Sequence, residues 1–215
     1  MRKSLRLGLY VITDARPDLG RGHLEVAEAA LEAGADAVQL RAKDVGGREM
    51  YELAVGLKEL LGRRGSGTLF LVNDRVDVAL AAGADGVHLG WDDLPPARAR
   101  LLLGEEKVLG VSASSTAEAL AALEAGADYL GAGPVYPTGT KADAGEPIGL
   151  EGLREITGRV DIPVVAIGGI TVDRVREVLE AGASGVAVIS AVIGADDMYE
   201  AVLRLRREVD RYLGR

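Results

Sequence analysis

The most constraining feature of this sequence is a ten-residue segment that recurs four times. The copies are LEAGADAVQL from Leu31, LAAGADGVHL from Leu80, LEAGADYLGA from Leu123 and LEAGASGVAV from Leu179, and they start 49, 43 and 56 residues apart. In each copy a helical pattern ends at a glycine, which can take the left-handed conformation past a helix end, and a short apolar run follows. The spacing leaves room for two strand–helix modules in each repeat.

Four such repeats predict eight strands alternating with eight helices. This pattern is typical of the α/β class and of the (β/α)8 TIM barrel, and we expect a single TIM-barrel domain over residues 1–215. Strands are expected near 7–12, 37–40, 68–72, 86–89, 107–111, 129–133, 163–167 and 185–189. Helices are expected near 23–33, 47–61, 75–82, 95–103, 116–125, 150–157, 172–181 and 196–213. An open doubly wound sheet is the alternative, but no GxGxxG follows any predicted strand.

Composition narrows the possible functions. A content of 48% apolar but only 4% aromatic residues indicates an aliphatic core, and the net charge of −8 argues against a nucleic-acid surface. No apolar run is long enough for a membrane span, and the absence of cysteine fits a cytoplasmic protein. With two histidines and no cysteine, a metal site would depend on carboxylates and would favour Mg²⁺. Association into a homo-oligomer stays open.

Polar side chains follow nearly every predicted strand. In a barrel the carboxyl ends of all strands meet at one face, where active sites are built. Arg41, Lys43 and Lys141 are cations from different segments of an acidic chain, and Asp74 and Asp93 suit one shared Mg²⁺. Cations and Mg²⁺ at one face predict a bound diphosphate.

The segment GAGPVYPTGTKADAGEPIG, residues 131–149, is predicted to be a functional loop. It holds five glycines and three prolines among nineteen residues, and the prolines force the chain out of regular pairing. Thr138, Gly139, Thr140 and Lys141 provide two hydroxyls, an approachable backbone and a cation, which suit an anion with several oxygens. The order differs from a P-loop, in which Gly and Lys are adjacent. The alternative is a solvated surface loop.

Two later strand ends predict a second phosphate site. IGGI at 167–170 places Gly168 and Gly169 before a helix, and VISA at 188–191 places Ser190 at the end of the neighbouring strand. Many barrels bind a monophosphate after their seventh and eighth strands. A diphosphate on one side and a phosphate on the other indicate two small phosphorylated substrates and a transferase.

Each candidate also has a structural interpretation. Residues directly before a predicted helix can cap its first turn, which applies to Asn73, Asp74 and Ser112. Asp92 and Asp93 precede a helix start, where an acid is favourable without any metal. Gly168 and Gly169 could serve only a tight turn. Arg41 and Lys43 could form a structural salt bridge, and His88 is more simply a packing residue or one that supports the site. Trp91 could wall a substrate ring or cover the barrel edge.

Seven segments in order along the chain resemble the thiamine-phosphate synthase family. They are VQLRAK at 38–43, VNDRVDVAL at 72–80, GADGVHLGWDD at 83–93, GVSA at 110–113, GPVYPTGTK at 133–141, AIGGIT at 166–171 and VISA at 188–191. The resemblance implies a Mg²⁺-dependent enzyme that joins hydroxymethylpyrimidine diphosphate to a thiazole phosphate, giving thiamine phosphate and diphosphate.

The same resemblance assigns roles to individual positions. It implies pyrimidine-diphosphate binding by Gln39, Leu40, Arg41, Ala42, Lys43, Asn73, Ser112 and Lys141, of which Arg41, Lys43, Ser112 and Lys141 would act in catalysis. It implies thiazole-phosphate binding by Thr138, Gly139, Thr140, Gly169, Ile189 and Ser190. It implies Mg²⁺ binding by Asp74 and Asp93.

The chain departs from the family pattern at three places. The family often has Glu at Ala42, Gln-Glu-Asp at residues 91–93 and His-Thr at residues 114–115. Two other functions remain: a paralogous thiazole tautomerase, which has less use for a diphosphate clamp, and a non-catalytic barrel that binds a phosphorylated metabolite. The presence of all three cations and both acids favours the synthase.

Overall fold

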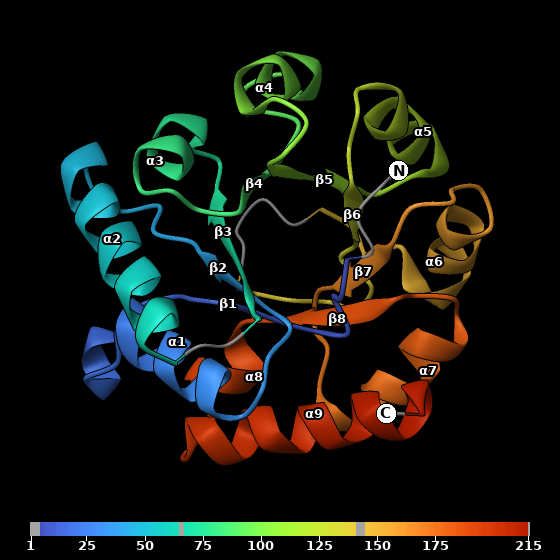
Figure 1. Ribbon diagram of the computed structural model, residues 1–215. Coiled ribbons are helices and arrows are strands. Elements are labelled where there is room, and N and C mark those ends of the chain that lie inside the picture. The colour runs from blue at the N-terminus through green and yellow to red at the C-terminus, as the bar shows by residue number, and fades with distance from the viewer. Residues whose placement is uncertain (1–4, 65–66, 141–144, 215) are drawn as a thin grey trace.

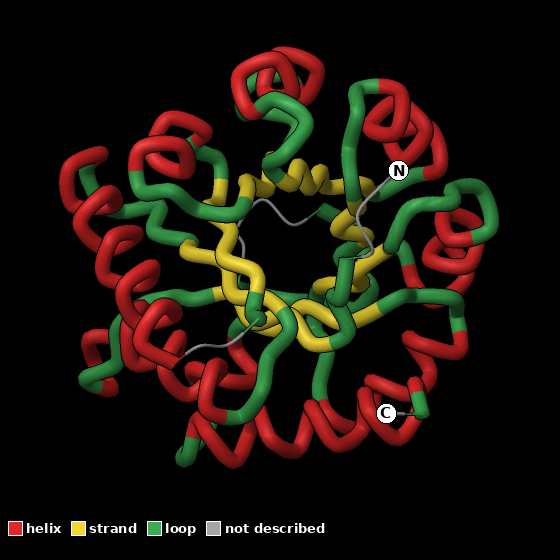
Figure 2. Tube along the Cα trace, in the orientation of Figure 1, coloured by secondary structure: helices red, strands yellow, loops and turns green. Residues whose placement is uncertain are grey.

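The computed structural model describes residues 5–64, 67–140 and 145–214, and its fold is the predicted (β/α)8 barrel. Eight parallel strands pair in chain order, and β8 pairs with β1 to close the sheet. The strands surround the centre and the helices form an outer ring, as Figure 1 shows by element and Figure 2 by class of secondary structure.

The strands and helices lie close to their predicted positions. The strands are β1 Leu9–Ile12, β2 Ala37–Leu40, β3 Leu69–Asn73, β4 Gly86–Leu89, β5 Val108–Ala113, β6 Tyr129–Ala132, β7 Val164–Ile167 and β8 Gly185–Val188. The α-helices are α1 His23–Glu32, α2 Gly47–Arg64, α3 Val76–Ala81, α4 Pro96–Leu103, α5 Thr116–Glu124, α6 Gly149–Thr157, α7 Val175–Glu180, α8 Ser190–Ile193 and α9 Met198–Leu213. Two 3-10 helices are η1 Pro17–Leu19 and η2 Val172–Arg174.

Three short helical segments differ from the prediction. The segments η1 and α8 were not expected, and the helix predicted at 172–181 begins as η2 and continues as α7. The last helix begins at Met198 because the Asp197 carboxylate accepts the Glu200 backbone N–H at 3.0 Å and caps the first turn. Short helices of one turn carry too little periodicity to be read from the sequence.

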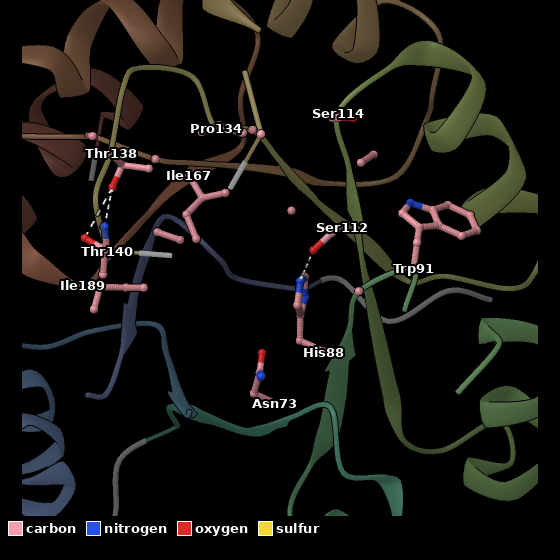
Figure 3. A pocket seen from close by; sticks show the side chains of 18 of the residues that line it. Asn73, His88, Trp91, Ser112, Ser114, Pro134, Thr138, Thr140, Ile167 and Ile189 are labelled. Atoms are coloured by element: carbon pink, nitrogen blue, oxygen red, sulfur yellow. Dashed lines mark hydrogen bonds between the residues drawn. The ribbon is translucent and has the colours of Figure 1, made fainter. Parts of the chain in front are cut away.

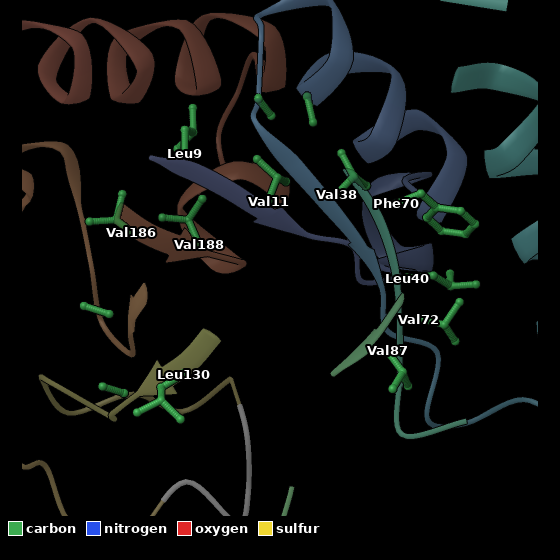
Figure 4. Packing of buried hydrophobic residues seen from close by; sticks show 14 of the residues in the cluster. Leu9, Val11, Val38, Leu40, Phe70, Val72, Val87, Leu130, Val186 and Val188 are labelled. Atoms are coloured by element: carbon green, nitrogen blue, oxygen red, sulfur yellow. The ribbon is translucent and has the colours of Figure 1, made fainter. Parts of the chain in front are cut away.

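The core forms two layers, because successive residues of a strand point to opposite faces of the sheet. Leu9 and Val11 belong to the layer between the strands and the helices, part of which Figure 4 shows. Tyr10 and Ile12 belong to the layer inside the barrel. Every residue of β1, β2, β4, β6 and β8 is buried, as expected for a parallel sheet covered on both faces.

The recurring segment is a structural device at the amino ends of the strands. Its glycines at 34, 83, 126 and 182 all have positive φ, from 67° to 95°. The acid two residues later accepts the backbone N–H of the first or second residue of the preceding strand: Asp36 from Leu9 at 2.9 Å, Asp85 from Phe70 at 2.8 Å and Asp128 from Leu109 at 2.8 Å. In the fourth copy Ser184 takes this position and accepts from Val164 at 3.4 Å.

Cations from the outer helices pair with these three acids. Arg206 of α9 contacts Asp36 at 2.7 Å, Lys58 of α2 contacts Asp85 at 3.4 Å, and Arg100 of α4 contacts Asp128 at 2.6 Å. Each acid therefore joins a strand start to a helix of the outer ring. The repeat explains the stability of this end of the barrel, whereas the candidate site lies at the other end.

Candidate active site

A cavity of about 360 Å³ opens at the carboxyl ends of the strands. Side chains following β2 to β8 line it, and Figure 3 shows them converging from opposite sides of the barrel. Ten of the predicted site residues are among them: Lys43, Asn73, Asp74, Asp93, Ser112, Thr138, Thr140, Gly169, Ile189 and Ser190. Segments far apart in the sequence thus contribute to one space, as the barrel topology requires.

The other predicted residues lie elsewhere or outside the described chain. Gln39 is inside the barrel, while Leu40 belongs to the layer between strands and helices, so its side chain lies away from the cavity. Ala42 borders a smaller adjoining cavity of about 240 Å³, shared with Lys43. Gly139 is not part of the cavity lining. Lys141 lies outside the described residues.

Arg41 is buried at the end of β2 and is also absent from the cavity lining. Its backbone N–H donates to Thr13 Oγ1 at 3.3 Å, and its Nη1 lies 3.9 Å from Asp14 Oδ2. The side chain is 10% exposed, and its Nε has no hydrogen-bond partner among the described residues. The structural ion pair considered from the sequence is therefore present but long, and it does not satisfy the whole guanidinium.

Asp74 and Asp93 both face the cavity, and neither caps a helix. The caps of α3 and α4 are Arg75 and Pro95, and neither makes a side-chain capping bond. Asp93 Oδ2 instead accepts the Gly90 backbone N–H at 2.7 Å. Asp74 has a φ of 64°, a left-handed conformation that is uncommon outside glycine, Asn and Asp. The capping interpretation is therefore wrong for Asp74, and the first turn of α4 contains no acid.

Asp74 also lies near a cation of the site. Lys43 Nζ is 4.0 Å from Asp74 Oδ2, and both side chains are partly exposed to the cavity. The backbone N–H of Asp74 donates to the His88 carbonyl at 2.9 Å, which fixes the strained residue against β4. Within the part of the chain that the structure describes, no group of three or more His, Cys, Asp or Glu could hold a metal.

The sequence left open whether Ser112 caps a helix or belongs to the site, and the structure gives these two roles to different serines. Ser115 caps α5, because its Oγ accepts the Glu118 backbone N–H at 3.2 Å. Ser114 donates through its backbone N–H and hydroxyl to the Glu118 carboxylate. Ser112 Oγ lies 3.0 Å from His88 Nε2 on the neighbouring strand and faces the cavity, as Figure 3 shows.

The loop after β6 is packed against the end of β7. Val135 N–H donates to the Ile167 carbonyl at 2.8 Å, and Tyr136 N–H donates to the Gly168 carbonyl at 3.1 Å. A Cβ on Gly168 would lie 2.5 Å from Pro134 Cβ, and one on Gly169 would lie 2.8 Å from the Pro137 carbonyl oxygen. These glycines therefore allow the loop after β6 to pack closely against the end of β7, in addition to any role in a turn. The described part of this loop is not merely solvated.

The threonines of this loop and Ser190, which follows β8, line the cavity. Thr140 N–H and Thr138 Oγ1 are 3.3 Å apart, so the two threonines form one local turn. Ile189 is buried, whereas Ser190 is exposed and begins the one-turn helix α8. The sequence predicted Ser190 as a strand-end residue but not this helix.

A chain of hydrogen bonds inside the barrel was missed by the sequence reasoning. Gln39 Nε2 donates to Tyr10 Oη at 2.7 Å, and the hydroxyls of Tyr10 and Tyr129 lie 2.9 Å apart. Tyr129 Oη lies 2.9 Å from His88 Nδ1, and the other ring nitrogen, His88 Nε2, lies 3.0 Å from Ser112 Oγ. Burial raises the pKa of both phenols well above the ordinary value, so both are neutral.

Glycines on other strands of the barrel make room for these rings. A Cβ on Gly110 would lie 2.2 Å from Tyr129 Cζ, and a Cβ on Gly131 would lie 2.9 Å from His88 Cε1. His88 is thus a residue that supports the site, as one sequence interpretation held. The available signal was two tyrosines at inward positions of strands whose neighbours carry glycine.

Trp91 is 42% exposed and lines the cavity beside Asp92. The side chain of this single tryptophan therefore lies at the entrance, as Figure 3 shows. No described helix is long and apolar enough to cross a membrane.

Fold and site together define a (β/α)8-barrel protein with a polar cavity at the carboxyl ends of its strands, the position of active sites in barrel enzymes. A family model described as thiamine monophosphate synthase matches residues 9–192. The chain therefore belongs to the thiamine monophosphate synthase family.

Relatives of high identity agree with this membership. A thiamine-phosphate synthase of Moorella thermoacetica is 53% identical over 96% of this chain and 98% of its own length. A thiamine-phosphate synthase of Pyrococcus furiosus is 52% identical over 97% of this chain and 98% of its own length. A solved thiamine phosphate pyrophosphorylase of Pyrococcus furiosus has a TM-score of 0.88 at 50% identity, covering 98% of each chain. These comparisons support thiamine-phosphate synthase activity, an enzymatic function in thiamine biosynthesis.

Proposed function

We propose that this protein condenses 4-amino-2-methyl-5-(diphosphooxymethyl)pyrimidine with 4-methyl-5-(2-phosphoethyl)thiazole, or its carboxylated form, as an alkyl transferase. The bond between the methylene carbon and the diphosphate oxygen breaks, and a bond from that carbon to the thiazole nitrogen forms. The products are thiamine phosphate and diphosphate, and the carboxylated thiazole would also release its carboxyl group as CO2. The observation that carries the proposal is the single cavity lined by Lys43, Asp74, Asp93, Ser112, Thr138, Thr140 and Ser190.

One side of this cavity suits the diphosphate. Lys43, Asn73 and Ser112 line it from three strand ends and supply a cation, an amide and a hydroxyl. Gln39, Leu40, Arg41, Ala42 and Lys141 complete the proposed pyrimidine-diphosphate set through the family resemblance. Two unit charges about 4 Å apart attract by roughly 4 kcal/mol at an effective dielectric near 20, before desolvation. Several such cations therefore stabilise charge that develops on the departing diphosphate.

The two acids of this side fit Mg²⁺. Asp74 and Asp93 present carboxylates to the same cavity without serving as helix caps, and Mg²⁺ commonly binds one or two carboxylates and completes its shell with water and phosphate oxygens. When bound, the ion would supply further positive charge for the leaving diphosphate. Lys43 Nζ, 4.0 Å from Asp74 Oδ2, would add positive charge on the same side of the cavity.

The opposite side suits the phosphate of the thiazole. Thr138, Thr140 and Ser190 provide hydroxyl donors, and Gly169 provides a close approach to the backbone. Gly139 and Ile189 belong to the proposed thiazole-phosphate set by resemblance. Holding both rings in one cavity converts an encounter of two substrates into a local reaction.

The chain's own residues need only bind, orient and exclude water. Diphosphate departs first, and the pyrimidinylmethyl cation that remains is attacked by the thiazole nitrogen. No serine, cysteine or lysine nucleophile is required, so Ser112 serves as a hydrogen-bond donor. The proposed order makes the rate sensitive to the positive side chains around the diphosphate.

A coupled assay tests the proposal. Diphosphate release is measured with the pyrimidine substrate alone, the thiazole phosphate alone and both together, each with and without Mg²⁺. We expect release only with both substrates and Mg²⁺. Binding of the pyrimidine substrate without release would favour a metabolite-binding barrel, and conversion of a thiazole phosphate isomer without diphosphate release would favour a tautomerase. Either result would contradict the proposed function.

A further inference from the structure

A second cluster of buried polar groups lies at the carboxyl ends of β1 and β2. Thr13 follows β1 and is 0% exposed, whereas His23, which begins α1, and Arg41, which follows β2, are each 8% exposed. No role in the proposed reaction accounts for the burial of His23 or Thr13. Burying polar groups is costly unless they are hydrogen-bonded, so the contacts of this cluster show what it holds in place.

The direction of its hydrogen bonds is fixed at one end. The Arg41 backbone N–H can only donate, and it reaches Thr13 Oγ1 at 3.3 Å. The same oxygen lies 2.9 Å from His23 Nδ1. A threonine hydroxyl can accept and donate at the same time, so while its oxygen accepts from Arg41 its proton can be donated to His23 Nδ1. A neutral imidazole that carries its proton on Nε2 completes this arrangement.

The surroundings of His23 favour that neutral form. Burial is the largest cause of a lowered His23 pKa, and the positive charge of Arg41 adds to it, whereas Asp14, Glu25 and Glu49 act in the opposite direction. His23 is also the first residue of α1, where the helix dipole disfavours a cation. The imidazole is therefore neutral at neutral pH.

We propose that neutral His23 is a positioning residue for Arg41 and acts through Thr13. The Thr13 hydroxyl holds the Arg41 backbone, and the imidazole holds the direction of the hydroxyl. Protonation of His23 replaces an acceptor by a donor and adds a positive charge near the guanidinium, so it displaces Arg41. The effect on turnover rests on the proposed function, in which Arg41 binds the pyrimidine diphosphate.

Paired substitutions separate this role from general packing. Thr13→Val removes the hydroxyl at nearly constant volume, and Thr13→Ser keeps it. His23→Leu removes the acceptor, and His23→Asn keeps an acceptor that does not titrate. We expect kcat/KM for the pyrimidine substrate at pH 8 to fall about tenfold in Thr13→Val and His23→Leu, since small misplacements near a reacting group are costly. Thr13→Ser and His23→Asn should stay within about threefold of the wild type.

The pH profile gives a signature that packing alone would not produce. The His23 pKa lies below its ordinary value, so kcat/KM of the wild type should fall along an acid limb below about pH 6.5. In His23→Asn, the part of this acid limb that comes from protonation of His23 should be absent. An identical acid limb in wild type and His23→Asn, or equal losses in Thr13→Val and Thr13→Ser, would overturn the proposal.

Nuclear magnetic resonance of the ligand-free protein tests the positioning without turnover. The chain has two histidines, so the ¹⁵N spectrum of the imidazoles contains two rings, and His23→Asn assigns them. At pH 7.5 we expect His23 to carry its proton on Nε2, and the Arg41 Nε–H to exchange faster in Thr13→Val than in Thr13→Ser. A His23 proton on Nδ1, or equal Arg41 exchange in both variants, would refute the positioning. If these signals appear as expected but no variant releases diphosphate, the proposed function fails and the positioning stands.

Discussion

The two ends of the barrel carry their polar residues in opposite ways. At the amino ends of β1, β3 and β5, the same acid of the repeat accepts a strand N–H and pairs with a cation from an outer helix. At the carboxyl ends, the strands β2 to β8 each contribute a different set of groups, and the sets converge on one cavity. The repeated end holds the fold together, while the varied end defines the chemistry.

This difference teaches how an internal repeat should be interpreted. A residue that recurs at equivalent positions of several modules solves a problem that every module shares, here the unpaired N–H at a strand start. A polar residue that occurs in only one module serves something that the module alone binds. Four substitutions follow from this comparison and test it, taken from the largest expected effect to the smallest.

Asp128→Ala should have the largest effect, and it should act on stability alone. The carboxylate accepts the Leu109 N–H at 2.8 Å and pairs with Arg100 at 2.6 Å, so its loss should reduce the free energy of unfolding by about 3 kcal/mol. Urea unfolding measures this change. Activity per folded molecule should stay the same. The control is Glu124→Ala, an exposed acid of the same repeat, which should change stability by about 0.5 kcal/mol or less.

Asp74→Asn should act at the other end and on turnover. Asn tolerates the φ of 64°, so the substitution removes charge without adding backbone strain. We expect kcat/KM to fall by about 100-fold, which corresponds to about 2.7 kcal/mol, with little change in unfolding. Asp77→Asn, at an exposed acid that pairs with Arg75, serves as the control. An Asp74→Asn enzyme that needs no more Mg²⁺ than the wild type and turns over at its rate would remove Asp74 from the metal site.

Lys141→Ala should have a smaller effect on the same end. The loss of one cation from the diphosphate site should reduce turnover at least tenfold, or about 1.4 kcal/mol, and leave unfolding unchanged. Lys141→Arg keeps the charge and should recover part of the rate. Unchanged steady-state kinetics in Lys141→Ala would show that this residue does not act on the leaving group.

Ser184→Ala should have the smallest effect, although it changes the same position of the repeat as Asp128. The Ser184 hydroxyl is neutral and lies 3.4 Å from the Val164 N–H, so its loss should cost less than about 1 kcal/mol. Comparing it with Asp128→Ala in one urea series measures what the acid adds to the repeat. Equal destabilisation by both would mean that the carboxylate charge contributes nothing.

Most of the fold could be predicted from the sequence because its signals are local. Apolar runs such as Val164–Ile167 and glycines such as Gly126 mark strands and helix ends within a few residues. The one-turn helix at Ser190–Ile193 could not be predicted, since it depends on packing at the barrel mouth. The role of the repeated acids was also missed, because each bonds a strand that lies 15 to 27 residues earlier.

The sequence predicted which residues belong to the site better than it predicted the directions of their side chains. Strand ends predicted which residues meet, and Lys43, Asp74, Asp93 and Ser112 do line one cavity. The direction of each side chain depends on register across the barrel, which a linear pattern does not contain. Gln39 therefore turned out to bond Tyr10 inside the barrel, and Arg41 lies beside Asp14.

The tyrosines inside the barrel also decide how ligands travel. Tyr10 is 2% exposed and Tyr129 is 0% exposed, and with Leu7 and Val108 they fill the middle of the barrel. Among the described residues these side chains close the barrel below the cavity, so the mouth is the opening that the structure offers to ligands. Under the proposed function, both substrates and both products would therefore share this one opening.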